Sequence, residues 1–378
     1  MKVPFLKLHR SENDSAAIQE ALQSGSLAGG GVFYERAKEL LSSKFGFKDL
    51  ILTQSCTSAL EFSAELLDIK PGDEVIVPSY AYVSTAGAFA NKGARLRFAD
   101  STSEHPNIDP DSVADLISDQ TKAIVALHYG GDSCEMDKLT SLASEQNIAL
   151  VEDAAHCIGS KWRDSYLGSI GDLGALSFQE TKNVSSGEGG ALIINDPELI
   201  QRSRVYSEKG TNRSDFLEGK IDRYDWVGRG TSVKPGELIC AALWSQLTEV
   251  DLINSKRKSI CQTYSDELSG LESSGRITIP MSYTESTGNG HIFSIVLNSL
   301  AERDQLINYL SSNGIQAFFH YGALHNSPFS KKEFNEGNDL KNAERFAIGL
   351  IRLPVYPSLT EQELEYVIEK VKLGIPSG

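Results

Sequence analysis

The alternation of short apolar stretches with longer amphipathic segments is the feature that most restricts the fold of this sequence. The apolar stretches are LILT (50–53), VIVP (75–78), ARLRFAD (94–100), AIVAL (123–127), IALVED (148–153), LGALSF (173–178) and GGALIIN (189–195). Segments such as TSALEFSAELLDI and EMDKLTSLASEQN lie between them, with apolar residues at helical spacing. Strands that alternate with helices predict an α/β fold, with a mostly parallel sheet covered by helices on both faces. The last two stretches leave no room for a helix between them, so one of them is expected to be antiparallel.

The pattern changes near Pro235. A long helical stretch is predicted over residues 237–268, followed by HIFSIVL, ERDQLINYLSSNG, IQAFFHY and a closing helix over residues 361–374. This order indicates a smaller α+β domain, and 378 residues exceed what one hydrophobic core usually serves. We therefore expect an N-terminal helix and glycine-rich loop (1–30), a large α/β domain (31–245) and a small C-terminal domain (246–378).

Composition excludes several classes of protein. The formal net charge is −15 and no long basic tract is present, which argues against nucleic acid as a partner. The apolar runs are far shorter than the roughly 20 residues of a membrane span, and the N-terminus does not read as a signal peptide. Five scattered cysteines without a CxxC pair fit reduced thiols and argue against a zinc site. We expect a cytoplasmic protein with no metal and no membrane partner.

An anionic substrate would need local cations to offset the acidic surface. The stretch EKGTNR supplies Lys209 and Arg213, and Arg229 and Lys234 follow it. Isolated, solvated cations are the alternative explanation.

Hydroxyl and thiol groups follow the first predicted strand. In open α/β sheets, ligands bind beyond the carboxyl ends of the strands. Ser55, Cys56 and Thr57 follow LILT, where the next helix begins. The free N–H groups of that helix start suit a phosphate. Ordinary capping of the helix by Ser or Thr explains the same residues equally well.

The next strand ends carry two tyrosines, an aspartate and a histidine. Tyr80 and Tyr82 follow VIVP, where an aromatic ring either stacks on a flat cofactor or packs in the core. Asp153 ends a run expected to be buried, so its carboxylate needs a cation or hydrogen bonds. His156 either accompanies Asp153 or is satisfied within the core.

Lys182 follows the strand LGALSF, within SFQETKNVSSGEGGAL. Alone, such a lysine is typical of a solvated turn. A Schiff-base lysine needs instead a shielded pocket that lowers its pKa. A phosphate-binding helix start, an aromatic ring, a buried carboxylate and a lysine at neighbouring strand ends are together what pyridoxal 5′-phosphate requires. The combination favours Lys182 as a Schiff-base lysine.

Four stretches resemble the DegT/DnrJ/EryC1/StrS family of sugar aminotransferases. They are VEDAAHCIGS, SFQETKNVSSGEGGAL, PSYAYVSTAGAFANKGARLRFAD and HYGALH, and the likeness runs from about Pro4 to the C-terminal helix. The resemblance implies the fold of the aspartate aminotransferase superfamily, fold type I, with a mostly parallel seven-stranded sheet. It also implies pyridoxal 5′-phosphate as the cofactor, and a homodimer with shared active sites.

The resemblance also implies a role for individual residues. Lys182 would be the Schiff-base lysine and proton shuttle, and Asp153 the partner of the pyridinium nitrogen. The other implied or candidate cofactor contacts are His156 at the ring, Tyr82 stacked on it, and Ser55, Cys56, Thr57 and Ser177 at the phosphate. Relatives often reach the phosphate of the partner subunit with an asparagine, and Ser232 of GTSVKP stands at that position here. His320 and Tyr321 of HYGALH join Lys209 and Arg213 as candidate substrate contacts.

The stretches SCTSALE, KGTNRS and TKN…SGEGGA most resemble members that aminate C4 of dTDP-4-keto-6-deoxy sugars. The resemblance implies L-glutamate as the amino donor and a dTDP-4-amino-4,6-dideoxy sugar of galactose configuration as the product, for surface polysaccharide or a related glycan. Amination at C4 with glucose configuration, and amination at C3, remain open. A non-catalytic regulator with this fold is disfavoured because Lys182 and Asp153 are both present. A nicotinamide-dependent dehydrogenase is disfavoured because TQSCTSAL lacks GxGxxG.

Overall fold

The computed structural model describes residues 1–334 and 339–375. Its centre is a seven-stranded sheet in the order β1-β9-β8-β5-β4-β2-β3. These strands are β1 (Leu50–Thr53), β2 (Glu74–Pro78), β3 (Arg95–Ala99), β4 (Thr121–Leu127), β5 (Ala149–Asp153), β8 (Leu173–Ser177) and β9 (Gly190–Ile194). Every pair is parallel except the pairs of β9, which runs antiparallel to β1 and β8. The predicted sheet is confirmed, including one antiparallel strand among the last two stretches.

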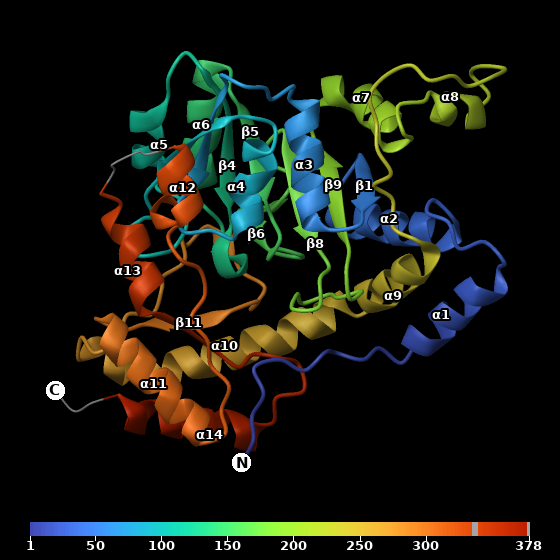
Figure 1. The fold of residues 1–378 in the computed structure, drawn as a ribbon. Helices are drawn as coiled ribbons and strands as arrows, with labels where there is room; N and C mark the ends of the chain where they lie inside the picture. Colours follow the sequence, from blue (N-terminus) through green and yellow to red (C-terminus); the bar gives the residue numbers. More distant parts are fainter. Residues whose placement is uncertain (335–338, 376–378) are drawn as a thin grey trace.

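Helices cover both faces of the sheet (Figure 1). Successive strand residues enter opposite cores: in β5, Leu150 packs into one core and Val151 into the other. The first core takes residues from α1 (Asp14–Gln23), α2 (Val32–Phe45), α5 (Pro110–Leu116), α6 (Met136–Gln146) and α9 (Glu237–Thr248), and the second from α3 (Cys56–Leu66), α4 (Val83–Ala90) and α13 (Lys341–Gly349). Burial on both faces explains why the strands read as continuous apolar runs rather than as alternating patterns.

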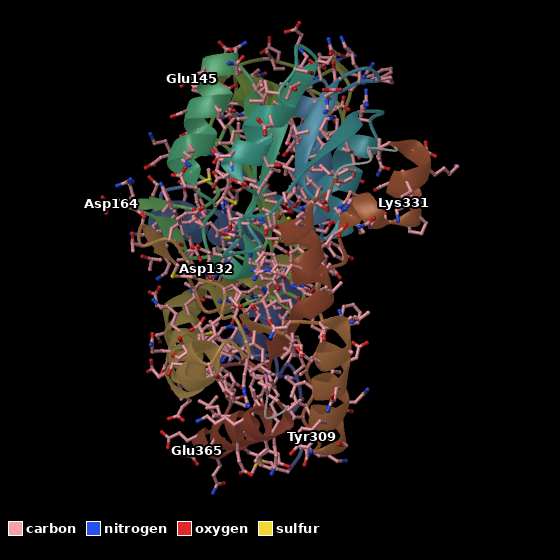
Figure 2. The ribbon with its side chains drawn as sticks, turned by 90° about the vertical axis from the view of Figure 1, so that its left-hand side faces the viewer. Asp132, Glu145, Asp164, Tyr309, Lys331 and Glu365 are labelled. Carbon is pink, nitrogen blue, oxygen red and sulfur yellow. The ribbon has the colours of Figure 1, made fainter. Side chains whose placement is uncertain are left out.

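A third core lies beyond α9. It is built from Val3 and residues of α10 (Val250–Ser273), β11 (Phe293–Val296), α11 (Leu300–Ser312), β12 (Leu350–Leu353) and α14 (Glu361–Gly374). Strands β11 and β12 pair antiparallel. Figure 1 shows α10 running beneath the central sheet, with α11 and α14 below it. Figure 2 shows the same division from the side, with Glu145 at the sheet end and Tyr309 and Glu365 at the other. The boundaries near residues 30 and 245 stay predictions.

Short elements complete the described structure. They are α7 (Pro197–Ser207), α8 (Arg213–Leu217), α12 (Pro328–Glu333), the 3₁₀ turns at Tyr129–Gly131 and Leu324–Asn326, and the small sheet of β6 (Lys161–Trp162), β7 (Ser165–Tyr166) and β10 (Ser286–Thr287). None of the helices in the described ranges combines the length and apolar character that a membrane span requires.

The helical stretch expected over residues 237–268 is two helices, α9 and α10, which separate at Glu249. This residue has φ −109° and ψ 9°, outside helical values. Its carboxylate accepts a hydrogen bond from Ser11 at 2.5 Å and contacts Nε2 of His9 at 2.6 Å. The break therefore lies where the N-terminal segment binds, a contact distant in sequence that helical periodicity does not reveal.

Glu152 anchors the turn that leads into β8. Its carboxylate is fully buried and accepts hydrogen bonds from the N–H groups of Gly168, Ile170 and Gly171, each at 2.7 Å. His128 contacts the same carboxylate at 3.0 Å. The buried charge is thus satisfied. These hydrogen bonds also tie the turn before β8, the strand that leads to the Lys182 loop, to β5.

We expect Glu152→Gln to lower the free energy of unfolding by about 1–3 kcal/mol, because an amide leaves one of the buried donors without an acceptor. Urea unfolding of the variant measures the loss. Glu145→Gln, on an exposed position of α6, is the matched control and should change stability by less than about 0.5 kcal/mol. Equal stability of the two variants would contradict this role of Glu152.

Candidate active site

The carboxyl ends of β5 and β8 lie side by side, since the two strands pair in parallel with Asp153 opposite Ala175. Asp153 ends β5, and Lys182 lies in the loop that follows β8. Lys182 and His156 line one pocket of about 40 Å³, together with His320 from the C-terminal part of the chain. The structure thus brings Lys182, Asp153 and His156 to the same edge of the sheet, as the order of strands predicts.

Asp153 is buried and held by three groups. Thr85 of α4 donates a hydrogen bond to Oδ2 at 2.7 Å, and the N–H of Ala155 donates to Oδ1 at 3.2 Å. The thiol of Cys56 lies 3.9 Å from Oδ1. Burial raises the pKa of Asp153, while the hydrogen bonds from Thr85 and Ala155 and the nearby charge of Lys182 limit the rise. The carboxylate is therefore rigidly oriented and still open to a further cationic partner.

Lys182 is half-buried, and burial lowers the pKa of its amine from the ordinary value of 10.5. Cys56 and Asp153 oppose this shift, and the positive charge of Arg352 adds to it. A lowered pKa favours the neutral amine, which is the form that acts as nucleophile and base. The half-buried position near Cys56 and Asp153 therefore favours a Schiff-base lysine over a solvated lysine in a turn.

The neighbours of His156 determine which of its two ring nitrogens carries the proton. Nδ1 accepts the N–H of Gly130 at 3.1 Å, so Nε2 carries the proton and faces the hydroxyl of Tyr321 at 3.4 Å. Burial, followed by the charge of Lys182, lowers the pKa of His156 well below 6.5, so the ring is neutral. The ring is thus satisfied as a core histidine, and it lines the same pocket as Lys182, whereas no hydrogen bond or ion pair among the described residues joins it to Asp153.

Tyr80 and Tyr82 have different surroundings. Tyr80 is fully buried against Tyr129, Tyr321 and Phe346 and belongs to the core. Tyr82 is 55% exposed at the start of α4, with its ring centroid 6.1 Å from that of Tyr321. Of the two, only Tyr82 has a ring accessible for stacking on a ligand.

The start of α3 presents the predicted cluster of small polar residues. The Ser55 hydroxyl accepts the N–H of Ser58 at 3.1 Å and so caps the helix. The hydroxyl of Thr57 donates to Ser84 at 2.8 Å. The N–H groups of Cys56 and Thr57, in the first turn, have no partner inside the helix and can bind an anion. Capping by Ser55 therefore leaves amides at this helix start that can bind an anion.

Gly190 allows this helix start to approach the sheet. A Cβ at Gly190 would lie 2.4 Å from the carbonyl carbon of Ser55 and 2.5 Å from the nitrogen of Cys56. Ser177 pairs with Gly190 across β8 and β9, which places Ser177 beside the same helix start. This arrangement brings the α3 amides, the Ser177 hydroxyl, Lys182 and Asp153 to neighbouring strand ends, as the cofactor requires.

We expect Gly190→Ala to weaken binding of the cofactor at least tenfold, because the added methyl group displaces the start of α3. Spectroscopic titration of the apoenzyme with pyridoxal 5′-phosphate measures the change. Gly87→Ala in α4 is the control, since a Cβ there meets nothing within 4 Å. Unchanged affinity in Gly190→Ala would show that the α3 start does not hold the phosphate.

The remaining candidate residues lie further from Lys182. Lys209 is exposed between α7 and α8, and Arg213 is exposed at the first position of α8, 3.5 Å from Glu208. Figure 1 shows α7 and α8 at the upper right, away from the loop after β8. Ser232 is exposed, and its carbonyl accepts a hydrogen bond from Gln54, next to the start of α3. Within one chain, Ser232 therefore lies near the start of α3, whereas the segment that carries Lys209 and Arg213 lies away from the loop of Lys182.

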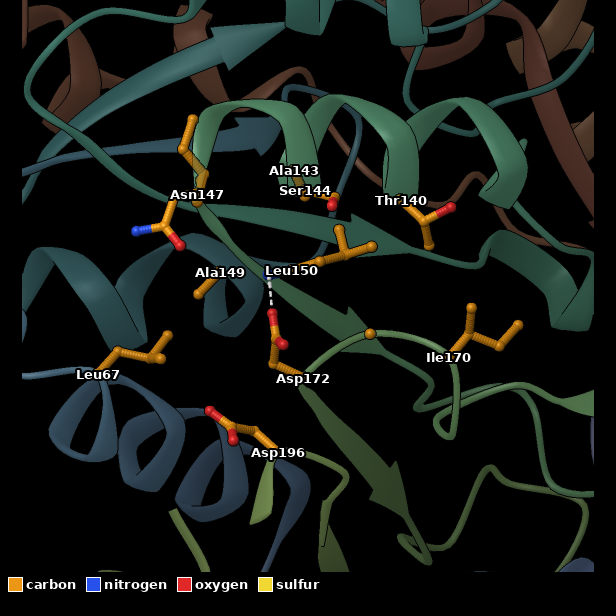
Figure 3. Close-up of a pocket in the computed structure, with 12 residues that line it drawn as sticks. Leu67, Thr140, Ala143, Ser144, Asn147, Ala149, Leu150, Ile170, Asp172 and Asp196 are labelled. Atoms are coloured by element: carbon orange, nitrogen blue, oxygen red, sulfur yellow. Dashed lines mark hydrogen bonds between the residues drawn. The ribbon is translucent and has the colours of Figure 1, made fainter. Parts of the chain in front are cut away.

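A second hollow, of about 410 Å³, lies at the opposite, amino ends of the strands (Figure 3). Asp172 and Asp196 line it, and the carboxylate of Asp172 accepts the N–H of Leu150 at 2.7 Å. Its lining residues include no lysine, arginine or histidine. It offers no group for amino transfer and does not suit an anionic substrate.

The model of the DegT/DnrJ/EryC1/StrS aminotransferase family matches residues 9–372. The chain belongs to this family. It is 31% identical, over 98% of its length and 96% of the relative, to dTDP-3-amino-3,4,6-trideoxy-alpha-D-glucose transaminase of Streptomyces venezuelae. It is 30% identical, over 94% and 92%, to the spore coat polysaccharide biosynthesis protein SpsC of Bacillus subtilis. The sugar aminotransferase fold predicted from the sequence is confirmed.

A solved structure of the same class identifies the cofactor. The PLP form of the putative sugar aminotransferase Spr1654 from Streptococcus pneumoniae superimposes with a TM-score of 0.89, at 25% identity, covering 99% of this chain and 98% of the other. A PMP form of that protein is also known. This family member is therefore a pyridoxal 5′-phosphate-dependent sugar aminotransferase of fold type I.

Sequence reasoning missed several polar residues around the site. Thr85, which orients Asp153, is a buried hydroxyl in the apolar helix VSTAGAFA, and this contrast was a usable signal. Arg257, His291 and Arg352 line the Lys182 pocket but come from α10, the 288–292 loop and β12. No local pattern marks them, because they reach the site only through the packing of the C-terminal elements.

Proposed function

We propose that this enzyme moves the amino group of L-glutamate to C4 of a dTDP-linked 4-keto-6-deoxy sugar. The products are 2-oxoglutarate and a dTDP-4-amino-4,6-dideoxy sugar, with the galactose configuration favoured. The observation that carries the proposal is the placement of Lys182 and the oriented Asp153 at adjacent strand ends beside the start of α3. The choice of sugar rests on the resemblance of SCTSALE, KGTNRS and TKN…SGEGGA to C4 transaminases.

Lys182 supplies the acid–base chemistry in this proposal. Its amine, with a pKa lowered by burial, takes the proton from the α carbon of glutamate, and in the second half-reaction Lys182 delivers a proton to the sugar carbon that receives nitrogen. His156 lines the same pocket, with a ring that its hydrogen bond from Gly130 holds in place.

The residues present fit pyridoxal 5′-phosphate. Asp153 would hold its ring nitrogen, Tyr82 and His156 its ring, and the α3 start with Ser177 its phosphate. When bound, the cofactor carries the amino group between the two substrates and accepts the electron pair of the bond broken at the donor carbon. Thr85 and Ala155 keep the Asp153 carboxylate oriented for this role.

Amination at C3 is the second candidate. It is favoured by the 31% identity to a Streptomyces venezuelae enzyme whose name describes a 3-amino sugar.

The name of SpsC supports a role for the product in polysaccharide synthesis.

A panel of nucleotide-linked 3-keto and 4-keto sugars with ¹⁵N-labelled L-glutamate separates these possibilities. We expect the label at C4 of a dTDP-linked product with an axial amino group. Label at C3, or an equatorial amine at C4, would replace the proposed product, and failure of every keto sugar would contradict the substrate class.

We also propose that the active unit is a homodimer in which Ser232 contributes to the site of the partner. Exposed apolar residues on the preceding segment, among them Trp226 and Val227, support a contact with a second chain. Mixing inactive Lys182→Ala subunits with subunits inactivated at Ser232 tests the sharing. Restored activity is expected, because a hybrid dimer then holds one intact site, and no restoration would indicate that Ser232 acts within its own chain.

A further inference from the structure

Three buried asparagines connect the Lys182 loop with α10 and with the loop before β11. Asn183 follows the lysine, Asn254 belongs to α10, and Asn289 lies in the loop before β11. We call these three residues the asparagine cluster. Each is less than 9% exposed, and the cluster joins the Lys182 loop to the C-terminal part of the chain.

Backbone carbonyls fix the orientation of every amide in the asparagine cluster, because a carbonyl accepts hydrogen bonds only from the NH₂ end. Nδ2 of Asn289 donates to the carbonyls of His156 and Ile158, at 2.8 and 3.1 Å. Nδ2 of Asn254 donates to Ile158 at 2.9 Å. Nδ2 of Asn183 donates to the carbonyl of Asn289 at 3.2 Å and to Oδ1 of Asn254 at 2.8 Å.

The orientation of Asn183 determines the tautomer of His291. Since Nδ2 of Asn183 is committed to donation, its Oδ1 faces Nδ1 of His291 at 2.9 Å. An amide oxygen only accepts, so Nδ1 must carry the proton. The backbone N–H of His291 donates to Oδ1 of Asn289 at 3.0 Å, which fixes the residue itself. Nε2 of His291 is then an acceptor with a free lone pair whenever the ring is neutral.

The surroundings of His291 keep its ring neutral. The groups that face it are His156, His320, Lys182 and Arg257, which are all bases or cations. Burial and then these neighbours lower the pKa of His291 well below 6.5. Within the part of the chain that the structure describes, no protein hydrogen bond engages Nε2, and His291 lines the same pocket as Lys182.

The cluster leaves little room for rearrangement. A Cβ at Gly131 would lie 2.2 Å from Oδ1 of Asn289, and one at Gly159 would lie 2.7 Å from Nδ2 of Asn254. Glycine at these two positions allows the loops on either side to close on the amides. The tautomer of His291 is thus set by rigid, fully paired groups.

We propose that the asparagine cluster fixes His291 with its proton on Nδ1, so that Nε2 accepts a hydrogen bond from the amine of Lys182 and positions it during amino transfer. The inference rests on the role of Lys182 in the proposed function. His291 acts through Lys182 and is a positioning residue. When Lys182 carries a proton between reacting carbons, an acceptor at this place stabilises the ammonium form that must exist in between.

Two substitutions of His291 separate positioning from packing. Glutamine places an acceptor near the position of Nε2 but loses the contact with Asn183, whereas asparagine keeps a donor to Asn183 and removes the acceptor. We expect His291→Asn to slow the glutamate half-reaction about tenfold or more, with the KM for glutamate changed less than about twofold. His291→Gln should be several-fold faster than His291→Asn, although it is the less stable variant. A rate for His291→Asn equal to or above that of His291→Gln would overturn the proposal.

A second measurement reads the tautomer in the apoenzyme and needs no turnover. Imidazole ¹⁵N NMR of the seven labelled histidines, with the His291→Asn variant to identify the signal, should show Nδ1 protonated and Nε2 not. Asn183→Ala should remove this preference, with His9→Gln as the control. A wild-type signal protonated at Nε2 would refute the inference. Failure of the proposed function would appear separately, as an active Lys182→Ala variant, and would leave the tautomer result unaffected.

Discussion

Lys182→Ala is expected to reduce turnover with glutamate and the keto sugar by at least about 10²–10⁴-fold, the usual contribution of a general acid–base group. The amine is the only part of the residue that the chemistry needs. The backbone N–H of residue 182 still donates to Gln179 in the variant, so the loop keeps its turn. Stopped-flow measurement of each half-reaction shows whether both are lost, as a shared base requires.

Lys332→Ala, on an exposed position of α12, is the matched control and should retain the wild-type rate. Chemical unfolding of Lys332→Ala should give a free energy within about 0.5 kcal/mol of the wild type. Lys182→Ala should be as stable as the wild type or more stable, because it removes an amine that is desolvated by burial. Activity of Lys182→Ala within about tenfold of the wild type would mean that another group moves the proton.

Asp153→Asn is expected to slow both half-reactions by roughly 10- to 150-fold. A hydrogen bond to a charged group is worth about 1.5–3 kcal/mol, and each 1.36 kcal/mol of barrier is a factor of ten in rate. A neutral amide accepts from Thr85 as before, but it cannot stabilise a protonated ring nitrogen. Single-turnover rates with glutamate alone, and with the keto sugar alone, measure the two effects.

In Asp153→Asn, we expect the free energy of unfolding to respond differently from the reaction rates. Burial makes the Asp153 carboxylate costly, as the raised pKa indicates, whereas an amide that accepts from Thr85 leaves the N–H of Ala155 without an acceptor. The two effects oppose each other, so the free energy of unfolding should change by less than about 2 kcal/mol. Asp164→Asn, at an exposed turn, is the control for the loss of one charge. A variant that loses stability but keeps its rate would show that Asp153 is structural.

The central sheet was predictable because its information is local. Each strand is buried on both faces, so residues such as Leu150 and Val151 are all apolar and the runs stand out. The C-terminal part was less predictable. Strand β12 is only four residues long and pairs with β11 across more than 50 residues of sequence, and the break at Glu249 coincides with contacts to His9 and Ser11 that are distant in sequence.

The residues of the candidate site also differ in whether a local sequence pattern indicates them. Asp153 and Lys182 were found because a polar residue at the end of an apolar strand is conspicuous, and the topology of parallel sheets gathers such ends. Thr85 and His291 were missed because their roles arise from packing between elements. The tautomer of His291 in particular depends on carbonyls of the β5–β6 loop, which no spacing in the sequence indicates.

The central claim is that Lys182 is the residue that binds the cofactor covalently and transfers the amino group. Reduction of the cofactor-loaded enzyme with borohydride, followed by peptide mass spectrometry, tests it most directly, because reduction makes the bond between lysine and cofactor permanent. We expect the visible absorbance band to disappear and the added phosphopyridoxyl mass to lie on Lys182 alone. A label on another lysine, or an enzyme that takes up no cofactor, would contradict the account.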